Sequence, residues 1–120
     1  MQNLAPDICR QRLLVEGFYS GDMDEQRVRE FLVGAAEHLS LRTYAEPIVF
    51  VPESGMGRIE NQGFDAFVPL IDSGISAYVW SARRFFSVLF YTCKGFPEDS
   101  AVDYVRGYFR VEGDVASQTI

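Results

Sequence analysis

The residues of this chain that could do chemistry lie in two neighbouring segments. Asp72 precedes Ser73, and Trp80 follows that serine by seven residues. Cys93 lies twenty residues past the serine, after a run of mostly apolar and aromatic residues. A serine hydroxyl or a cysteine thiol can act as a nucleophile, or carry a proton, once its surroundings activate it. Each of these residues also has a simpler interpretation.

Each of these residues, considered alone, can be explained without an active site. Ser73-Gly74 is typical of a hairpin turn between two strands. A single cysteine such as Cys93 is more often a buried small apolar residue than a catalyst. Tyr78 would pack on a strand surface, and His38, the only histidine, would complement the negative end of a helix dipole.

Taken together, the residues resemble the motifs of the S-adenosylmethionine decarboxylase family, over roughly residues 12 to 112. The acidic residue before Ser73, Trp80 and Cys93 stand at that family's spacing. In bacterial members the serine becomes a pyruvoyl group by self-cleavage of the chain. The resemblance therefore implies a cleavage junction between Asp72 and Ser73, a pyruvoyl cofactor made from Ser73, and a proton-donating role for Cys93.

The chemistry implied by the resemblance begins with attack of the serine hydroxyl on the preceding peptide carbonyl, which gives an ester. A base then removes the serine α-proton, and elimination followed by hydrolysis leaves the pyruvoyl group at a new N-terminus. Its carbonyl reacts with a substrate amine and accepts electrons as carbon dioxide leaves. Such a site needs a strained junction, an oxyanion donor and a proton-transfer residue. Gly74 would give the backbone the freedom to take up that strain.

Several polar side chains of the family's site are replaced. Tyr78 stands where the family has the histidine that assists elimination, and a neutral phenol accepts a proton poorly near pH 7. Ala82 replaces a glutamate that would contact the substrate ribose, and Asp65 stands where a processing serine is expected. The resemblance implies that Phe18, Trp80 and Asp65 contact the substrate. We expect Ser73, Tyr78 and Cys93 to converge at one end of a sheet.

The composition favours one compact domain over several other classes of protein. The 120 residues are 48% hydrophobic and 14% aromatic, which is enough for a substantial core. The net charge of −6 argues against nucleic-acid binding and would suit a small cationic metabolite. Cys9, Cys93 and the single histidine leave no metal cluster to build. With no signal segment and no apolar run of membrane length, we expect a cytoplasmic protein without membrane contact.

Two segments have the periodicity of amphipathic helices. In residues 25–39 the apolar side chains recur at helical spacing and form one stripe. A second helix is predicted over residues 101–109. Strands are predicted over residues 12–19, 43–51, 63–71, 74–81 and 84–91, and residues 111–115 could add a short last strand.

The remaining expectations concern strand environments and connecting segments. Pro47 indicates that the second strand lies at an edge or contains a bulge. Residues 84–91 are apolar enough to be buried on both faces of a sheet. Within a single domain of residues 1–120, we expect a loose arm over residues 1–10, a mobile loop over 52–62 and a polar tail over 116–120.

The order of these elements predicts an α+β fold, a two-layer sandwich of an antiparallel sheet with two helices on one face. Two helices can cover only one face of the sheet. The other face must bury against something, and a second copy of the chain is the simplest partner. We therefore expect a homodimer.

The leading functional hypothesis is a relative of the S-adenosylmethionine decarboxylases of spermidine biosynthesis that is unprocessed or altered in activity. The replacement of the histidine by Tyr78 favours it. An active pyruvoyl-dependent decarboxylase of S-adenosylmethionine, or of a basic amino acid such as arginine, is the first alternative, and retention of Ser73 and Cys93 favours that. An unrelated non-catalytic interaction module is the second alternative.

Overall fold

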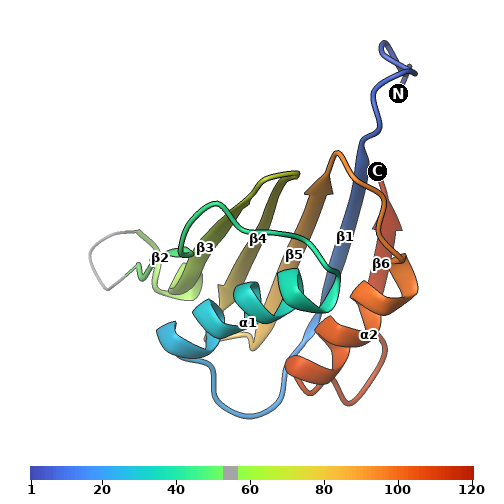
Figure 1. Cartoon of the computed structure of the whole chain (residues 1–120). Helices are drawn as coiled ribbons and strands as arrows, with labels where there is room; N and C mark the ends of the chain where they lie inside the picture. The colour runs from blue at the N-terminus through green and yellow to red at the C-terminus, as the bar shows by residue number, and fades with distance from the viewer. Residues whose placement is uncertain (53–56) are drawn as a thin grey trace.

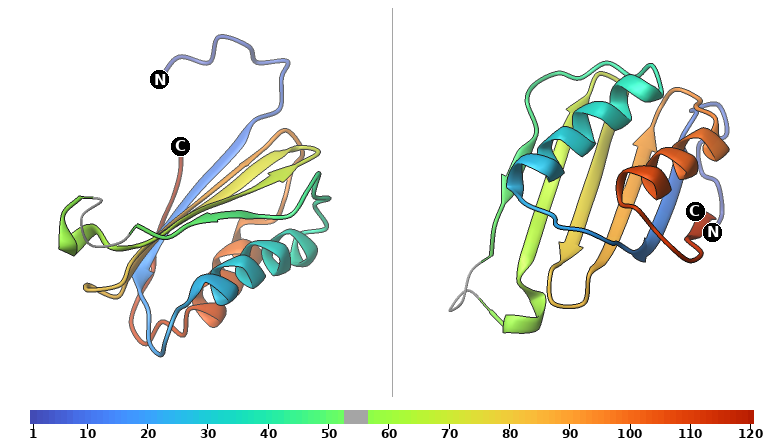
Figure 2. Two further views of the ribbon diagram at one scale, coloured as in Figure 1. Left: turned by 90° about the vertical axis from the view of Figure 1, so that its left-hand side faces the viewer. Right: turned by 90° about the horizontal axis from the view of Figure 1, so that it is seen from below.

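The computed structural model describes residues 1–52 and 57–120 and contains one six-stranded antiparallel sheet (Figure 1). The strand order is β2-β3-β4-β5-β1-β6, and both helices lie on the same face of the sheet (Figure 2). This confirms the predicted α+β two-layer fold. The elements, in chain order, are β1 (Gln11–Phe18), α1 (Glu25–His38), β2 (Ile48–Phe50), a 3-10 turn (Ile59–Asn61), β3 (Gly63–Leu70), β4 (Ser73–Trp80), β5 (Phe85–Thr92), α2 (Glu98–Tyr108) and β6 (Ala116–Thr119).

Both helices form because an apolar stripe faces the sheet. The Asp24 carboxylate caps α1 by accepting a hydrogen bond from the backbone N–H of Arg27 at 2.7 Å. Phe109, just after α2, stacks on Phe86 of β5 with ring centroids 4.2 Å apart, which joins the two layers.

No helix in the part of the chain that the structure describes is long and apolar enough to cross a membrane.

The strands show the alternation that a one-sided core requires. On β5, Phe86, Val88 and Phe90 are completely buried under the helices, whereas Ser87 and Leu89 on the opposite face are only half-buried. The prediction that this strand is buried on both faces is therefore wrong for the single chain. Its apolar composition does not reveal that one face lacks a covering layer.

The two strands at the sheet edges differ from the sequence-based prediction. β2 has only three residues and starts just after Pro47, and it is an edge strand as expected. The last strand is not 111–115 but Ala116–Thr119, so the segment predicted as a polar tail is the other edge strand, paired with β1. All four of its side chains are exposed, so no apolar pattern marks it. Backbone pairing with β1 and a hydrogen bond from the Thr119 hydroxyl to the Glu98 carboxylate hold it in place.

The remaining connecting segments agree in part with expectation. Residues 1–10 contain no helix or strand and project beyond the sheet (Figures 1 and 2). Of the predicted mobile loop 52–62, residues 53–56 lie outside the described residues, and Ile59–Asn61 form the 3-10 turn.

A tyrosine between the helices should make folding sensitive to alkaline pH. Burial, with smaller contributions from Tyr108 and Glu37, raises the pKa of Tyr104 to about 12. The unfolded chain would release this proton near pH 10, the usual phenol value of about 10. Protonated Tyr104 therefore contributes fully to the free energy of unfolding below about pH 10. This contribution is lost as the pH rises through about 12. We predict that Tyr104→Phe flattens this fall in urea-unfolding free energy, whereas Tyr44→Phe, at an exposed site, does not. Equal slopes in both variants would contradict the assignment.

Candidate functional site

The junction between β3 and β4 is a tight hairpin in which Ser73 has an unusual backbone. Leu70 pairs with Ser73 across the hairpin, so only Ile71 and Asp72 form the loop. The φ angle of Ser73 is 125°, in a region that non-glycine residues rarely adopt. A backbone of this kind costs on the order of 1–3 kcal/mol and persists only where surrounding structure holds it. The Asp72–Ser73 junction is thus a strained one.

The structure brings Ser73 and Cys93 into direct contact. The antiparallel register of β4 and β5 pairs Ser73 with Thr92, which puts Cys93 just beyond the end of β5. The Ser73 Oγ and Cys93 Sγ atoms lie 3.2 Å apart, within hydrogen-bonding distance. Cys93 is exposed rather than a buried apolar residue. The predicted convergence of these two residues is correct.

A backbone donor completes the junction. The N–H of Cys93 donates a 2.8 Å hydrogen bond to the carbonyl oxygen of Asp72. That carbonyl belongs to the peptide bond between Asp72 and Ser73. Its carbon is the atom that the serine hydroxyl would attack. A fixed N–H at this oxygen can stabilise negative charge as the carbonyl becomes tetrahedral. Because the donor is a backbone group, no residue type in the sequence marks it.

The glycine after the serine has a different role from the one predicted. Gly74 is not among the residues with a positive φ, so the strain lies at Ser73 itself. A Cβ atom at Gly74 would lie 2.3 Å from the Phe67 ring on β3. A side chain at this position would have to displace the Phe67 ring, which covers the Gly74 backbone.

Tyr78 does not join Ser73 and Cys93 within one chain. It lies five residues along β4, about 16 Å away at the usual rise of a strand. It is on the uncovered face of the sheet and is 40% exposed. The prediction that all three residues converge is wrong for the single chain, because a strand carries side chains away from one another along its length.

Tyr78 belongs instead to a polar row that crosses the uncovered face. In register, Glu16 of β1 stands opposite Ser87 of β5, Ser87 opposite Tyr78, and Tyr78 opposite Asp65 of β3. Ser87 donates a 2.8 Å hydrogen bond to the Glu16 carboxylate. The row therefore carries a phenol between two carboxylates. Sequence reasoning found Tyr78 and Asp65 but missed Glu16 and Ser87, which only strand pairing brings alongside.

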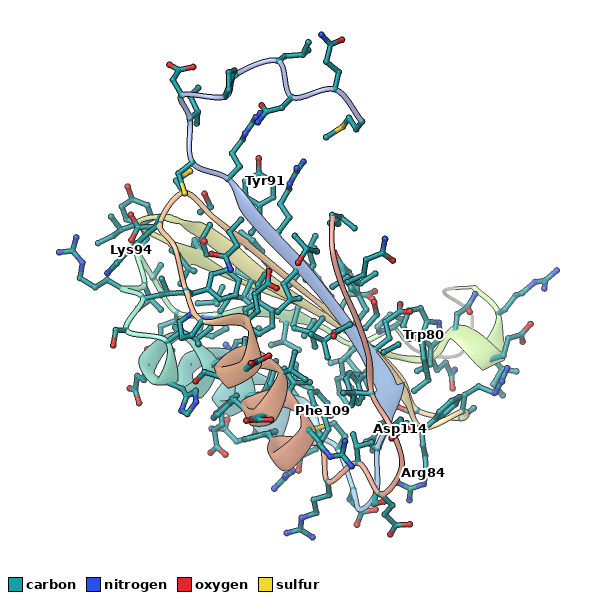
Figure 3. All side chains as sticks on the ribbon, turned by 90° about the vertical axis from the view of Figure 1, so that its right-hand side faces the viewer. Trp80, Arg84, Tyr91, Lys94, Phe109 and Asp114 are labelled. Carbon is teal, nitrogen blue, oxygen red and sulfur yellow. The ribbon has the colours of Figure 1, made fainter. Side chains whose placement is uncertain are left out.

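An aromatic hollow lies at the other end of the sheet. Figure 3 shows Trp80 near one end of the strands and Tyr91 and Lys94, which flank the Cys93 segment, near the other. The Phe85 ring lies 5.3 Å from that of Phe18 and 5.4 Å from that of Trp80. The hollow has a volume of about 310 Å³ and is lined by Phe18, Glu60, Asn61, Trp80, Arg83 and Phe85.

The hollow brings together two of the predicted substrate contacts, Phe18 and Trp80, but not Asp65. Asp65 lines two adjacent depressions, one beside Trp80 and one beside Tyr78. Glu60 supplies a carboxylate to the hollow, which Ala82 does not line. The sequence did not single out Glu60, because it reaches the hollow from the separate 3-10 turn.

The described residues contain no group of three or more His, Cys, Asp or Glu side chains placed to hold a metal ion. The single histidine, His38, lies in the last turn of α1, where its Nε2 atom is 2.9 Å from the Ser100 hydroxyl. Its ring stacks on Tyr104 at 5.0 Å. His38 thus contacts α2 and lies outside the junction.

The strain at Ser73 can be measured by comparing two substitutions that both remove the hydroxyl. Ser73→Gly suits the positive φ angle, whereas Ser73→Ala keeps the unfavourable side chain. We predict that the glycine variant is the more stable by about 1 kcal/mol in urea unfolding. An alanine variant as stable as the glycine variant would show that the junction carries little strain.

Comparison with known proteins extends the likeness to the whole fold. No family model matches the sequence, and no curated protein sequence is similar to it. Among solved structures, the crystal structure of the adenosylmethionine decarboxylase from Aquifex aeolicus VF5 matches with a TM-score of 0.71. The match covers 94% of this chain and 89% of that chain, at 22% sequence identity. The chain therefore has an adenosylmethionine decarboxylase-like fold.

Proposed function

We propose that this chain is an S-adenosylmethionine decarboxylase-like protein that stays unprocessed or has altered activity. The observation that carries the decarboxylase likeness is the junction itself, where the Ser73 hydroxyl contacts the Cys93 thiol and the Cys93 N–H donates to the Asp72 carbonyl. These groups suit attack of the hydroxyl on the carbonyl, which forms an ester and frees the Ser73 amine. The later elimination needs a base, and Tyr78 offers a phenol in place of an imidazole.

The cofactor implied by the resemblance is a pyruvoyl group made from Ser73. The residues present fit the first requirements for making it, because the junction combines a strained serine with a donor at the preceding carbonyl. When formed, such a group supplies an electrophilic carbonyl that accepts electrons during decarboxylation. Cys93, in contact with Ser73, is placed to hold or deliver a proton there.

Separation of the groups within one chain supports a homodimer. β4 has eight residues, so its Ser73 end and its Trp80 end are about 23 Å apart. A small ligand cannot span both ends of one sheet. A two-fold axis between two stacked sheets, perpendicular to the strands, would place the Ser73 end of each copy over the aromatic hollow of the other. Tyr78, two residues from the Trp80 end, would then approach the partner's junction.

The uncovered face has the side chains that such an interface needs. Six of its large side chains are 39–66% exposed in the single chain, which is unusual for a face of a stable sheet. These residues are Phe18, Ile48, Phe50, Phe67, Tyr78 and Tyr91. Burial of this face by a second copy accounts for the apolar character of β5 on both sides.

The ligand class follows from what the uncovered face offers. The carboxylates of Glu16 and Asp65 favour a cation, and the aromatic hollow offers ring faces to a cationic or planar group. S-Adenosylmethionine has both a cationic centre and a planar base, and a basic amino acid has only the cation. We therefore propose a small cationic metabolite as the ligand.

An active pyruvoyl-dependent decarboxylase is the second candidate. One specific observation favours it, since the strained Ser73 and the Cys93 N–H donor serve no evident purpose in a chain that only binds a ligand. The two candidates differ in whether the chain cuts itself.

We predict that the freshly purified chain has a single intact mass and does not decarboxylate S-adenosylmethionine, because the base for elimination is missing. Tyr78→His should permit partial cleavage before Ser73. Hydroxylamine should cut the unmodified chain before Ser73 if the ester accumulates. Intact-mass spectrometry measures the three cleavage outcomes, and release of carbon dioxide from S-adenosylmethionine measures the activity.

The matched control is Ser73→Ala in both backgrounds, which removes the attacking hydroxyl and should abolish every cleavage. Efficient spontaneous cleavage of the unmodified chain, with a carbonyl-reactive new N-terminus, would contradict the unprocessed state. It would establish the pyruvoyl enzyme instead.

The homodimer can be tested on the uncovered face. Leu89 lies half-buried at its centre, opposite Leu14 and Ser76. We predict that Leu89→Glu shifts the protein to monomer in sedimentation velocity, because a charge would be buried at the interface. Val33→Glu, on an exposed position of α1, is the control and should remain dimeric. A native protein that sediments as a monomer would refute the dimer.

A further inference from the structure

A small hollow lies on the helix layer, away from the Ser73 junction. It is formed where the chain passes from β1 to α1 and where it leaves α2, at the end of the molecule that contains Arg84 and Phe109 (Figure 3). Its volume is about 170 Å³, and its lining residues are Ser20, Gly21, Asp22, Arg27 and Arg110. Two arginines in one hollow are notable in a chain of net charge −6.

Arg27, in the first turn of α1, is held in place by an aromatic neighbour. Its guanidinium carbon lies 5.1 Å from the centroid of the Tyr108 ring, and the Tyr108 hydroxyl donates a 2.7 Å hydrogen bond to the Arg27 carbonyl. The buried Nε atom of Arg27 has no hydrogen-bond partner among the described residues. Because this Nε atom is inaccessible, a ligand in the hollow would have to accept from the two Nη groups of Arg27, which lines it.

Arg110 reaches the hollow from the segment after α2. Its Nη1 atom lies 3.8 Å from the position that a Cβ of Gly21 would occupy, so the guanidinium overlies the loop. In the ranges 1–52 and 57–120, neither Arg27 nor Arg110 forms an ion pair with a carboxylate. Both positive charges are therefore available to a ligand.

Asp22, the one carboxylate that lines the hollow, is paired with an arginine. Asp22 lies 3.9 Å from the guanidinium of Arg84, and its side chain is fully exposed. Arg84 also donates to the Gly21 carbonyl, which ties the loop to the β4–β5 turn. The repulsion that Asp22 would exert on an anion is therefore reduced, and the loop is held in a defined shape.

We propose that this hollow binds a small oxyanion of the phosphate class. The guanidinium groups of Arg27 and Arg110 would donate to its oxygens from two sides, since the planar fork of arginine matches such anions. The Ser20 hydroxyl would donate a further hydrogen bond. The N-terminus of α1 is already capped by the Asp24 carboxylate, with Glu25 in its first turn, so the two arginines carry the binding. The site is independent of the function proposed for Ser73.

The test is titration of the unmodified 120-residue chain with inorganic phosphate at constant ionic strength, followed by calorimetry. We expect saturable binding of one phosphate per chain. Arg110→Gln should weaken it roughly tenfold or more, the loss expected for one charge-assisted hydrogen bond. Arg106→Gln is the matched control, because it removes the same charge from the last turn of α2, outside the hollow. It should change the affinity less than about twofold.

A second titration with methyl phosphate distinguishes the sources of the phosphate group. Tighter binding of the ester indicates a phosphorylated metabolite, and tighter binding of inorganic phosphate indicates the free ion; either supports the site. Arg27→Lys keeps the charge but loses the fork, and should weaken both ligands. Absence of saturable binding for both ligands, or equal losses in the Arg110 and Arg106 variants, would overturn the proposal. Circular dichroism of each variant separates loss of binding from loss of folding.

Discussion

The antiparallel register between β4 and β5 is the constraint on which the candidate site depends. Because Ser73 stands opposite Thr92, the next residue, Cys93, meets the hairpin loop at Asp72. One alignment thus sets the contact between Ser73 and Cys93 and the hydrogen bond from the Cys93 N–H to the Asp72 carbonyl. A slip of one residue would turn the side chains of β5 to opposite faces and expose Phe86 and its buried neighbours. Core packing therefore protects the geometry of the junction.

The same register explains how strain can persist at Ser73. A φ angle of 125° costs on the order of 1–3 kcal/mol. Burial of even one phenylalanine stabilises a fold by about as much, at 1.5–3 kcal/mol, and Phe86 and Phe90 of β5 are both completely buried. The strands on either side of the hairpin can thus hold the serine where an isolated hairpin would relax.

The sheet has two unlike faces, one covered by the helices and one uncovered (Figure 2). On the helix side, Phe86 stacks on Phe109 within the core. The hollow lined by Arg27 and Arg110 lies at the margin of this side. On the other side, the junction, the polar row and the aromatic hollow are spread along the strands. If these groups form one site, as we propose, that site needs either a long ligand or a second protein surface. The apolar side chains left exposed on that face favour the second surface.

The sequence alone determined the elements whose signals are local. The apolar stripe of residues 25–39 predicted α1, alternation predicted the central strands, and the spacing of Ser73 and Cys93 matched two residues that a shared register brings together. Tertiary structure alone decided the remainder. The φ angle of Ser73 and the donor at the Asp72 carbonyl are backbone properties that residue type does not encode. β6 has no apolar pattern, and Tyr78 is separated from Ser73 by the rise of its own strand. Glu16 and Asp65 share a row only because four strands pair, since distant segments become neighbours through packing and not through sequence spacing.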